Sequence, residues 1–225
     1  MKTVAVIPAY NEQGRIGAAV ADAALFCDAV VVVDDCSVDV SGREALEAGA
    51  IVLRHEINRG QGAALQTGMD YALHTLAADI IVHFDADGQM RGADIPRLVQ
   101  PIKDDQADIV LGSRFLGEKT NMPFSRRLVL KAGIVFTMAL SGIRVSDTHN
   151  GFRALSRKAV EVMRITLDRM AHASEILDLI KVRDLRYVEV PVKIQYSEET
   201  LGKGQSSFGA FTIVKDILKG KFFDL

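Results

Sequence analysis

Cysteine is scarce in this chain of 225 residues, and tryptophan is absent. The two cysteines, Cys27 and Cys36, are too few for a disulfide framework or for a zinc site built from thiolates. We therefore expect two free thiols, which suit a protein of the reducing cytosol.

An excess of positive charge is also lacking. Lysine and arginine together number 27 against 29 aspartates and glutamates, and the isoelectric point lies near 6.2. Proteins that bind DNA or RNA without sequence preference rely on a basic surface. The composition therefore argues against a nucleic acid as a partner.

No apolar run is long enough to cross a membrane. The longest one, from Ala132 to Ile143, is interrupted by small and polar residues and falls short of the ~20 residues that a spanning helix needs. The first residues, Met1 to Ile7, lead directly into an expected strand and lack the longer apolar stretch and cleavage site of a signal peptide. We expect a cytoplasmic protein without a transmembrane helix.

Two glycine motifs that bind phosphate groups are missing as well. No G-x-G-x-x-G follows the first expected strand, and no G-x-x-x-x-G-K-[ST] occurs anywhere in the chain. These absences disfavour the dinucleotide-dependent dehydrogenases and the P-loop nucleotidases.

What the sequence does contain is an alternation of short β-branched runs and longer helical patterns, with 48% hydrophobic residues to build a core. The expected strands are Thr3–Pro8, Ala29–Asp34, Ile51–Arg54, Ile80–Phe84 and Asp108–Leu111, and the expected helices are Glu12–Phe26, Ser41–Ala48, Gly62–Leu76 and Ile95–Lys103. Crossovers of this length connect parallel strands. The sequence therefore predicts an α/β fold with a mostly parallel, Rossmann-like central sheet and helices on both faces.

The second half of the chain is less regular. We expect helices over 126–141, 156–163 and 174–182, a glycine-containing segment over 147–153, and a strand over 187–196 that Pro191 interrupts. No linker, low-complexity tract or repeat divides the chain, so we expect one domain over residues 1–225.

The last residues, 208–225, form an amphipathic helical pattern. Apolar residues from Phe208 to Phe222 fall near one helical face, and Lys215, Lys219 and Lys221 lie elsewhere. One interpretation is a helix that packs on its own domain. The other is a helix that lies in a membrane interface or contacts a small membrane partner.

Polar and acidic residues follow three of the expected strands, which is where open α/β sheets bind ligands. Asp85 and Asp87 end a buried strand and, being two residues apart, can face the same way. Such a pair can hold Mg²⁺ or Mn²⁺, which takes its remaining ligands from water and a diphosphate. The alternative is an Asp-rich turn that caps the next helix.

Other strand ends allow two interpretations each. Asp34 and Asp35 form either a turn with a helix cap or a pair of acceptors for a base or a ribose hydroxyl. The glycines of residues 58–62 either let backbone N–H groups approach an anion or simply start a helix. His83 lies inside a strand, and we interpret it as a core residue or as a second layer behind a site.

Six blocks follow one another along the chain: Pro8 to Glu12, Val33 to Ser37, Asn58 to Ala64, Asp85 to Gln89, Gly112 to Phe115 and Asp147 to Arg153. In this order, between about Val4 and Tyr196, they resemble the family 2 glycosyltransferases of the GT-A fold. Within that family the chain is most similar to the polyprenyl-phosphate sugar synthases, such as dolichyl-phosphate mannose synthase.

This resemblance implies a donor in which a sugar is linked to a nucleoside diphosphate, UDP or GDP. The implied nucleotide-sugar positions are Pro8, Tyr10, Asn11, Glu12, Val33, Asp34, Asp35, Asp85, Ala86 and Gln89. Asp85, Asp87 and Gln89 match the positions around the metal, Mg²⁺ or Mn²⁺, and the diphosphate. Residues 1–115 would be the nucleotide-binding half, and residues 116–207 the acceptor side.

Basic residues complete the implied site. Arg114 matches an arginine that meets the phosphates, and Arg126 or Arg127 resembles the basic position that follows it. The mannose synthases have a further arginine near the C-terminal strand that has no counterpart here. Lys203 is the candidate to supply its charge.

The resemblance also implies direct displacement with inversion at the anomeric carbon. A polyprenyl phosphate acceptor is already ionised and needs no general base, whereas a saccharide hydroxyl needs one. Asp147 is the candidate base in the second case, and capping of the turn at Gly151 is its structural alternative. A sugar-nucleotidyltransferase is disfavoured because no glycine-rich basic loop follows the first strand. A non-catalytic nucleotide-sugar-binding subunit stays an alternative.

Overall fold

The computed structural model describes residues 1–117, 143–148, 150–167 and 172–195. The helix expected at 126–141, the amphipathic stretch 208–225 and the basic candidates Arg126, Arg127 and Lys203 lie outside these described residues. Among the helices that the structure describes, none is long and apolar enough to cross a membrane.

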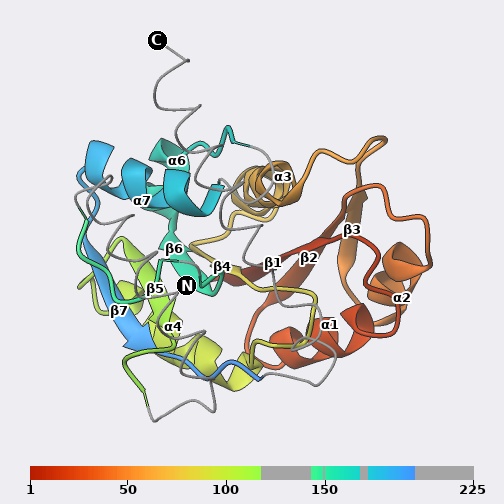
Figure 1. Ribbon diagram of the computed structural model, residues 1–225, viewed down its shortest axis with the longest axis horizontal. Coiled ribbons are helices and arrows are strands. Elements are labelled where there is room, and N and C mark those ends of the chain that lie inside the picture. Colours follow the sequence, from red (N-terminus) through yellow and green to blue (C-terminus); the bar gives the residue numbers. More distant parts are fainter. Residues whose placement is uncertain (118–142, 149, 168–171, 196–225) are drawn as a thin grey trace, which may run out of the picture.

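A seven-stranded mixed sheet forms the centre of the molecule, with the strand order β3-β2-β1-β4-β6-β5-β7 (Figure 1). The strands are β1 Thr3–Ala9, β2 Ala29–Asp34, β3 Ile51–Arg54, β4 Ile80–His83, β5 Ile109–Ser113, β6 Arg153–Ser156 and β7 Tyr187–Pro191. All pairings are parallel except those of β6, which runs antiparallel to β4 and to β5. The predicted α/β class and mostly parallel sheet are confirmed.

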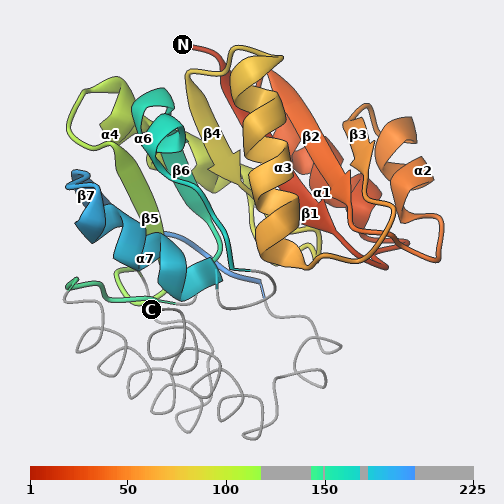
Figure 2. The same cartoon turned by 90° about the horizontal axis from the view of Figure 1, so that it is seen from above.

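Helices cover both faces of the sheet, as Figures 1 and 2 show. They are α1 Ile16–Ala24, α2 Ser41–Glu47, α3 Gln61–His74, α4 Ile95–Lys103, α6 Arg157–Val162 and α7 His172–Val182, with a 3-10 turn, η1, at Gly92–Asp94. Alternate strand residues belong to two buried apolar clusters, one on each face of the sheet. One cluster includes residues of α1 and α4, and the other includes residues of α3, α6 and α7. The helices thus use the period-2 alternation of the strands to build a three-layer α/β/α molecule.

Three elements differ from the sequence expectation. Of the strand expected over 187–196, only Tyr187–Pro191 forms β7, and the described residues 192–195 belong to no strand. β6 was not predicted: only four residues long, it begins with the buried Arg153 and enters the sheet between strands that are neighbours in sequence. Helix α1 begins at Ile16 rather than at Glu12, because Gly14 has a φ of 80° and the Glu12 carbonyl accepts the Arg15 and Ile16 N–H groups. A short strand at a long sequence separation gives no periodic signal, and a turn within a helical pattern is equally hard to read.

Helix α3 lies unusually close to the centre of the sheet. A Cβ at Gly68 would overlap Cγ1 of Val6 on β1 and would lie 3.2 Å from Cγ2 of Val33 on β2. The missing side chain lets the helix settle against both strands. As a result, the N-terminus of α3 stands at the edge of the sheet where β1, β2 and β4 end.

Candidate active site

The loops that follow β1 and β2 are tied together by backbone donors. Four successive N–H groups of the first loop bond to side-chain oxygens of the second loop and of α2: Asn11 to Ser37 Oγ (3.0 Å), Glu12 to Ser41 Oγ (2.7 Å), Gln13 to Asp39 Oδ2 (3.2 Å) and Gly14 to Glu44 Oε2 (2.7 Å). The Val38 N–H in turn donates to Asn11 Oδ1 at 2.9 Å. Because these N–H groups already have acceptors within the protein, a ligand would contact the side chains of this loop and not these backbone donors.

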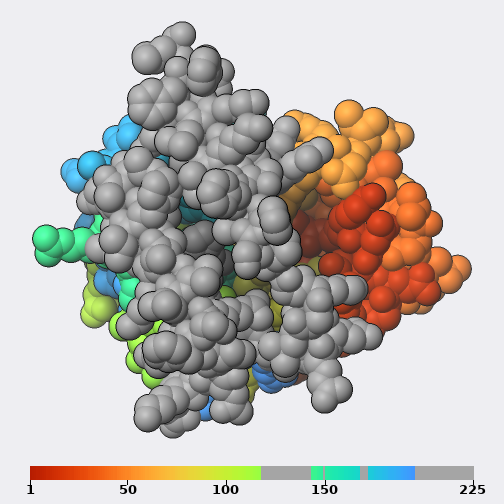
Figure 3. All heavy atoms as spheres, in the orientation of Figure 1, coloured from red at the N-terminus to blue at the C-terminus, as the bar shows by residue number. Residues whose placement is uncertain are grey.

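The side chains of the predicted nucleoside positions differ in their exposure. Tyr10 is 47% exposed, whereas Val33 is fully buried in the cluster under α3. Pro8 pairs with Val33 across β1 and β2 and is half-buried, as are Asn11 and Glu12. Tyr10 is therefore the side chain of this set that is open to a base, and Val33 can contribute only through its backbone. The N-terminal segments, red and orange, lie side by side on the surface in Figure 3.

Asp34 and Asp35 are both buried and both have internal partners. Asp34 pairs with Arg54 and accepts the Ser37 N–H at 2.8 Å. Asp35 accepts the N–H groups of Arg59 at 2.9 Å and Gly60 at 2.6 Å, directly before α3. The Ser37 N–H bond to Asp34 supports the turn interpretation, whereas Val40 and not an aspartate stands at the N-cap of α2, and base recognition stays a prediction.

A histidine extends the contacts of Asp35. His55 Nδ1 lies 2.7 Å from Asp35 Oδ1, and its Nε2 lies 3.0 Å from the hydroxyl of Thr67 on α3. This relay connects the end of β2 with the first turns of α3. Asp35 therefore fixes where the helix begins, and with it the side chain of Gln61.

The Asp-x-Asp segment lies at the carboxyl end of β4, next to the N-terminus of α3. Gln61 donates its side-chain amide to Asp85 Oδ1 at 3.2 Å, and Asp87 Oδ1 accepts the Gln89 N–H at 3.0 Å. Ala86 is buried between the two aspartates. Asp85 lies against Gly151, where a Cβ would stand 2.9 Å from Oδ2. A side chain at this position would push the Asp85 carboxylate out of its present place.

Negative charge accumulates around Asp85. Burial, together with the negative charges of Asp87 and Glu12, raises the pKa of this carboxyl group to about 7, and the positive charge of Arg153 opposes the rise. Crowded carboxylates of this kind are stabilised by a divalent cation, and their oxygens are the ligands that Mg²⁺ and Mn²⁺ prefer. The donor set thus fits the implied metal, although no three acidic, histidine or cysteine side chains of the described residues form a metal-binding group by themselves.

Arg114 and Asp147 form a bidentate ion pair. Arg114 Nε and Nη2 donate to the two carboxylate oxygens of Asp147 at 2.7 Å each, and the Arg114 backbone N–H donates to Oδ2 at 3.1 Å. The side chain of Arg114 is 11% exposed and that of Asp147 is 1% exposed. The structure thus brings together the predicted phosphate-binding arginine and the candidate base, with both oxygens of the base engaged.

Arg153, at the start of β6, links the two groups of predicted residues. It pairs in register with His83 of β4 on one side and with Leu111 of β5 on the other. Burial lowers the pKa of Arg153 to about 10, although the charges of Asp85 and Asp147 act to raise it. One buried cation therefore stands between the carboxylates of both groups. This role of Arg153 was not predicted, because the residue belongs to β6, a strand without a recognisable pattern in the sequence.

His83 lies behind this site in the described part of the chain. Its imidazole is buried, and burial lowers its pKa well below the usual value, as do the nearby Arg153 and His172. A neutral ring suits the predicted place in the core or behind the site. The free thiols expected for Cys27 and Cys36 are also observed, and burial raises the pKa of Cys27 to about 12.

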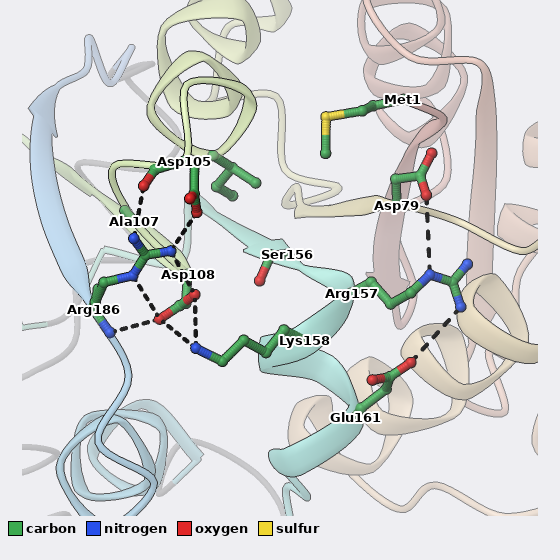
Figure 4. Close-up of a pocket in the computed structure, with 11 residues that line it drawn as sticks. Met1, Asp79, Asp105, Ala107, Asp108, Ser156, Arg157, Lys158, Glu161 and Arg186 are labelled. Carbon is green, nitrogen blue, oxygen red and sulfur yellow. Dashed lines mark hydrogen bonds and ion pairs between the residues drawn. The ribbon is translucent and has the colours of Figure 1, made fainter.

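A hollow of about 550 Å³ opens at the opposite edge of the sheet, where the parallel strands begin (Figure 4). Its charged side chains form ion pairs with one another: Asp108 bonds to Lys158 and Arg186, and Arg157 lies near Asp79 and Glu161. Burial alone would raise the pKa of Asp108, but hydrogen bonds from Arg186 and Lys158 lower it to about 2. We interpret this cluster as a structural clamp on β5, β6 and β7, remote from the predicted residues.

The sheet topology, with acid-bearing loops at the carboxyl edge, is that of the GT-A fold. The fold matches that of glucosyl-3-phosphoglycerate synthase from Mycobacterium tuberculosis, solved with Mn²⁺, UDP and glucosyl-3-phosphoglycerate, with a TM-score of 0.71 and 18% identity. That match covers 96% of this chain and 77% of the synthase.

The chain belongs to glycosyl transferase family 2, whose family model matches residues 4–164. It is 34% identical to the UDP-N-acetylglucosamine–dolichyl-phosphate N-acetylglucosaminyltransferase of Methanococcus voltae, over 97% of each chain. It is 29% identical to the undecaprenyl-phosphate mannosyltransferase of Micrococcus luteus, over 93% of this chain and 89% of that enzyme. The predicted family and the transfer of a sugar from a nucleotide sugar are thereby confirmed.

Proposed function

We propose that this protein transfers a hexose from a UDP- or GDP-linked donor to a polyprenyl phosphate, with inversion at the anomeric carbon. The two relatives named above act on dolichyl phosphate and undecaprenyl phosphate, and they match this chain over nearly its whole length. Their names support the class of acceptor and leave the sugar open.

The observation that carries the choice of acceptor is the Arg114–Asp147 pair. A general base for a saccharide hydroxyl needs a carboxylate oxygen that can receive a proton. Both oxygens of Asp147 already accept hydrogen bonds from a permanently charged guanidinium, and the side chain is 1% exposed. A phosphate acceptor, which is ionised at neutral pH, needs no such base.

The residues at the carboxyl edge divide the work of binding the donor. Tyr10 offers an open ring at the nucleoside end, while Asp34 and Asp35 hold the loops that shape this half of the site. Asp85 and Asp87, with Gln89 beside them, would hold Mg²⁺ or Mn²⁺. When bound, the cation would offset charge on the donor diphosphate.

The reaction exchanges one bond at the anomeric carbon for another. An oxygen of the acceptor phosphate attacks the anomeric carbon and forms a new bond to it. At the same time the bond between the anomeric carbon and the nucleoside diphosphate breaks, and the leaving nucleoside diphosphate takes the electron pair. Arg114 would stabilise the charge that develops there, because a guanidinium held rigidly by Asp147 needs no reorganisation during the reaction. The residues expected to complete the acceptor side, Arg126 or Arg127 and Lys203, stay predictions, as does the division into halves at about residue 115.

A transfer assay tests the proposal directly. Purified full-length protein is incubated with Mn²⁺, a radiolabelled UDP- or GDP-sugar and undecaprenyl phosphate in detergent, and label is counted in the organic phase. We expect acid-labile lipid-linked label that depends on the acceptor. Transfer only to water-soluble saccharides, or donor binding without turnover across all donors, would instead favour a hydroxyl acceptor or a non-catalytic subunit.

A further inference from the structure

Glu189, on the edge strand β7, directs its carboxylate at the loop that carries Asp147. Its oxygens accept the Ser146 N–H at 2.8 Å, the Ser146 hydroxyl at 2.9 Å and the Asp147 N–H at 3.3 Å. The parallel register pairs Glu189 with Leu111 of β5, two residues before Ser113. Three segments far apart in the sequence therefore meet at one half-buried carboxylate.

A second connection runs from the same loop to the residue before Arg114. The hydroxyls of Ser146 and Ser113 lie 2.7 Å apart, and the Phe115 N–H donates to Ser113 Oγ at 3.2 Å. Arg114 is thus held through its side chain by Asp147, and its two sequence neighbours are held by the serine pair. Glu189 supports both connections, because Ser146 and Asp147 are the residues that it binds.

We propose that Glu189 is a positioning residue for the reaction, which fixes the orientation of the Arg114 guanidinium through Ser146 and Asp147. This inference rests on the proposed role of Arg114 toward the phosphates. A carboxylate suits the position because it only accepts hydrogen bonds and here receives N–H and O–H groups alone. A glutamine that keeps its oxygen at the Oε1 position would place its NH2 group against the Ser146 N–H, which donates to both carboxylate oxygens, and this clash would displace the loop.

The chain contains a matched control for this chemistry. Glu175, on α7, accepts the Thr166 N–H at 2.8 Å, the Thr166 hydroxyl, and the Leu167 N–H at 2.9 Å. Like Glu189, it binds two adjacent backbone N–H groups and one hydroxyl, but it holds Thr166 and Leu167, of which Leu167 packs against Gly62 of α3, and neither belongs to the loop that carries Asp147. A purely structural effect of losing such a carboxylate should therefore appear in both variants.

The experiment compares Glu189→Gln, Glu175→Gln and Arg114→Lys in the full-length protein, measuring chemical denaturation, UDP affinity, kcat and KM. We expect both glutamine variants to lose similar stability. Only Glu189→Gln should lower kcat, by about tenfold or more, with UDP affinity and donor KM changed less than about threefold. Combined with Arg114→Lys, the Glu189 change should cost little further activity, because it acts through the arginine.

Each outcome decides between the inference and the function on which it rests. If Arg114→Lys leaves transfer intact, the proposed role of Arg114 fails. If Arg114→Lys is impaired while Glu189→Gln equals Glu175→Gln in kcat, or if the double variant shows fully additive losses, only the inference about Glu189 fails. If Glu189→Gln does not fold, Ser146→Ala takes its place in the double-mutant comparison with Arg114→Lys. We then expect kcat to fall by about threefold, and non-additive losses in the double variant would support the inference.

Discussion

Burial, with the neighbouring charges of Asp87 and Glu12, raises the pKa of the Asp85 carboxyl group to about 7. In the unfolded chain an aspartate titrates near ~4. The native protein therefore retains a proton that the unfolded chain releases, and the free energy of unfolding falls as the pH rises from about 4 to 7. Above about pH 7 the metal-free protein is destabilised by the full cost of the ionised Asp85 carboxylate.

We predict that Asp85→Asn stabilises the metal-free protein while impairing it as an enzyme. At pH 8 the free energy of unfolding should rise by about 1 kcal/mol, because a repelled charge is removed, and transfer should fall by roughly 100-fold. Urea denaturation at pH 5 and pH 8 measures the first effect, and the gain should vanish at the lower pH. A variant less stable than the parent at pH 8 would contradict the prediction.

Asp108 gives the opposite behaviour at the other edge of the sheet. Its pKa is lowered to about 2, so its contribution to stability is present above about pH 4 and is lost as the pH falls from about 4 to 2. We expect Asp108→Asn to lower the free energy of unfolding at pH 7 by about 2 kcal/mol, since hydrogen bonds between charged groups break. Transfer activity of the folded variant should stay within twofold of the parent, and a large kinetic defect would refute the purely structural role.

At the scale of elements, the approach of α3 to the sheet makes Gly68 a sensitive position. Gly68→Ala should destabilise the protein by about 3 kcal/mol, because the added methyl overlaps Val6 and the helix must move. Gly17→Ala on α1 is the matched control: its nearest neighbour is the Glu44 carbonyl oxygen at 4.0 Å, so it should be neutral or stabilising by up to ~1 kcal/mol. Thermal unfolding compares the two, and equal effects would show that the contact with β1 is not tight.

Elements with a strong local pattern could be predicted from the sequence, and those set by distant partners could not. The first five strands and four helices follow from periodicity to within a few residues, and α6 and α7 begin within two residues of expectation. β6 depends on β4 and β5, which flank it in space and not in sequence. A strand of four residues is too short to show, in its own sequence, that it pairs with such neighbours.

The same limit applies to single residues of the site. Asp85, Asp87 and Arg114 follow strands, and their position in the sequence already indicates the carboxyl edge. Glu189 alternates with Val188 and Val190 in a half-buried strand and reads as a solvent-facing residue until its contact with Ser146 is known. Which side chains pair with which was therefore visible only in three dimensions.

At the scale of the whole molecule, an acceptor carried by a lipid requires contact with a membrane. We predict that the stretch 208–225 supplies it, by combining an apolar face with lysines attracted to anionic lipid at roughly 1 kcal/mol each. The full-length protein should co-sediment with anionic vesicles at low salt and be released at high salt.

Removal of residues 208–225 should abolish this sedimentation and leave UDP affinity unchanged. A full-length protein that stays in solution at low salt would point to a protein partner at the membrane instead. Neutral vesicles serve as the control for the electrostatic part of the attraction.

The antiparallel insertion of β6 also determines when β5 can join the rest of the sheet. β4 and β5 follow each other in the chain, yet they never pair, because the strand between them is made 40 residues after β5 ends. A nascent chain that has emerged only as far as β5 therefore exposes the open edge of β4 and a β5 that has no partner on either side, and pairings across such distances form slowly. Chaperone binding to ribosome-held chains should decline once residue 156 has left the exit tunnel, which ties the solubility of this enzyme to the timing of its synthesis.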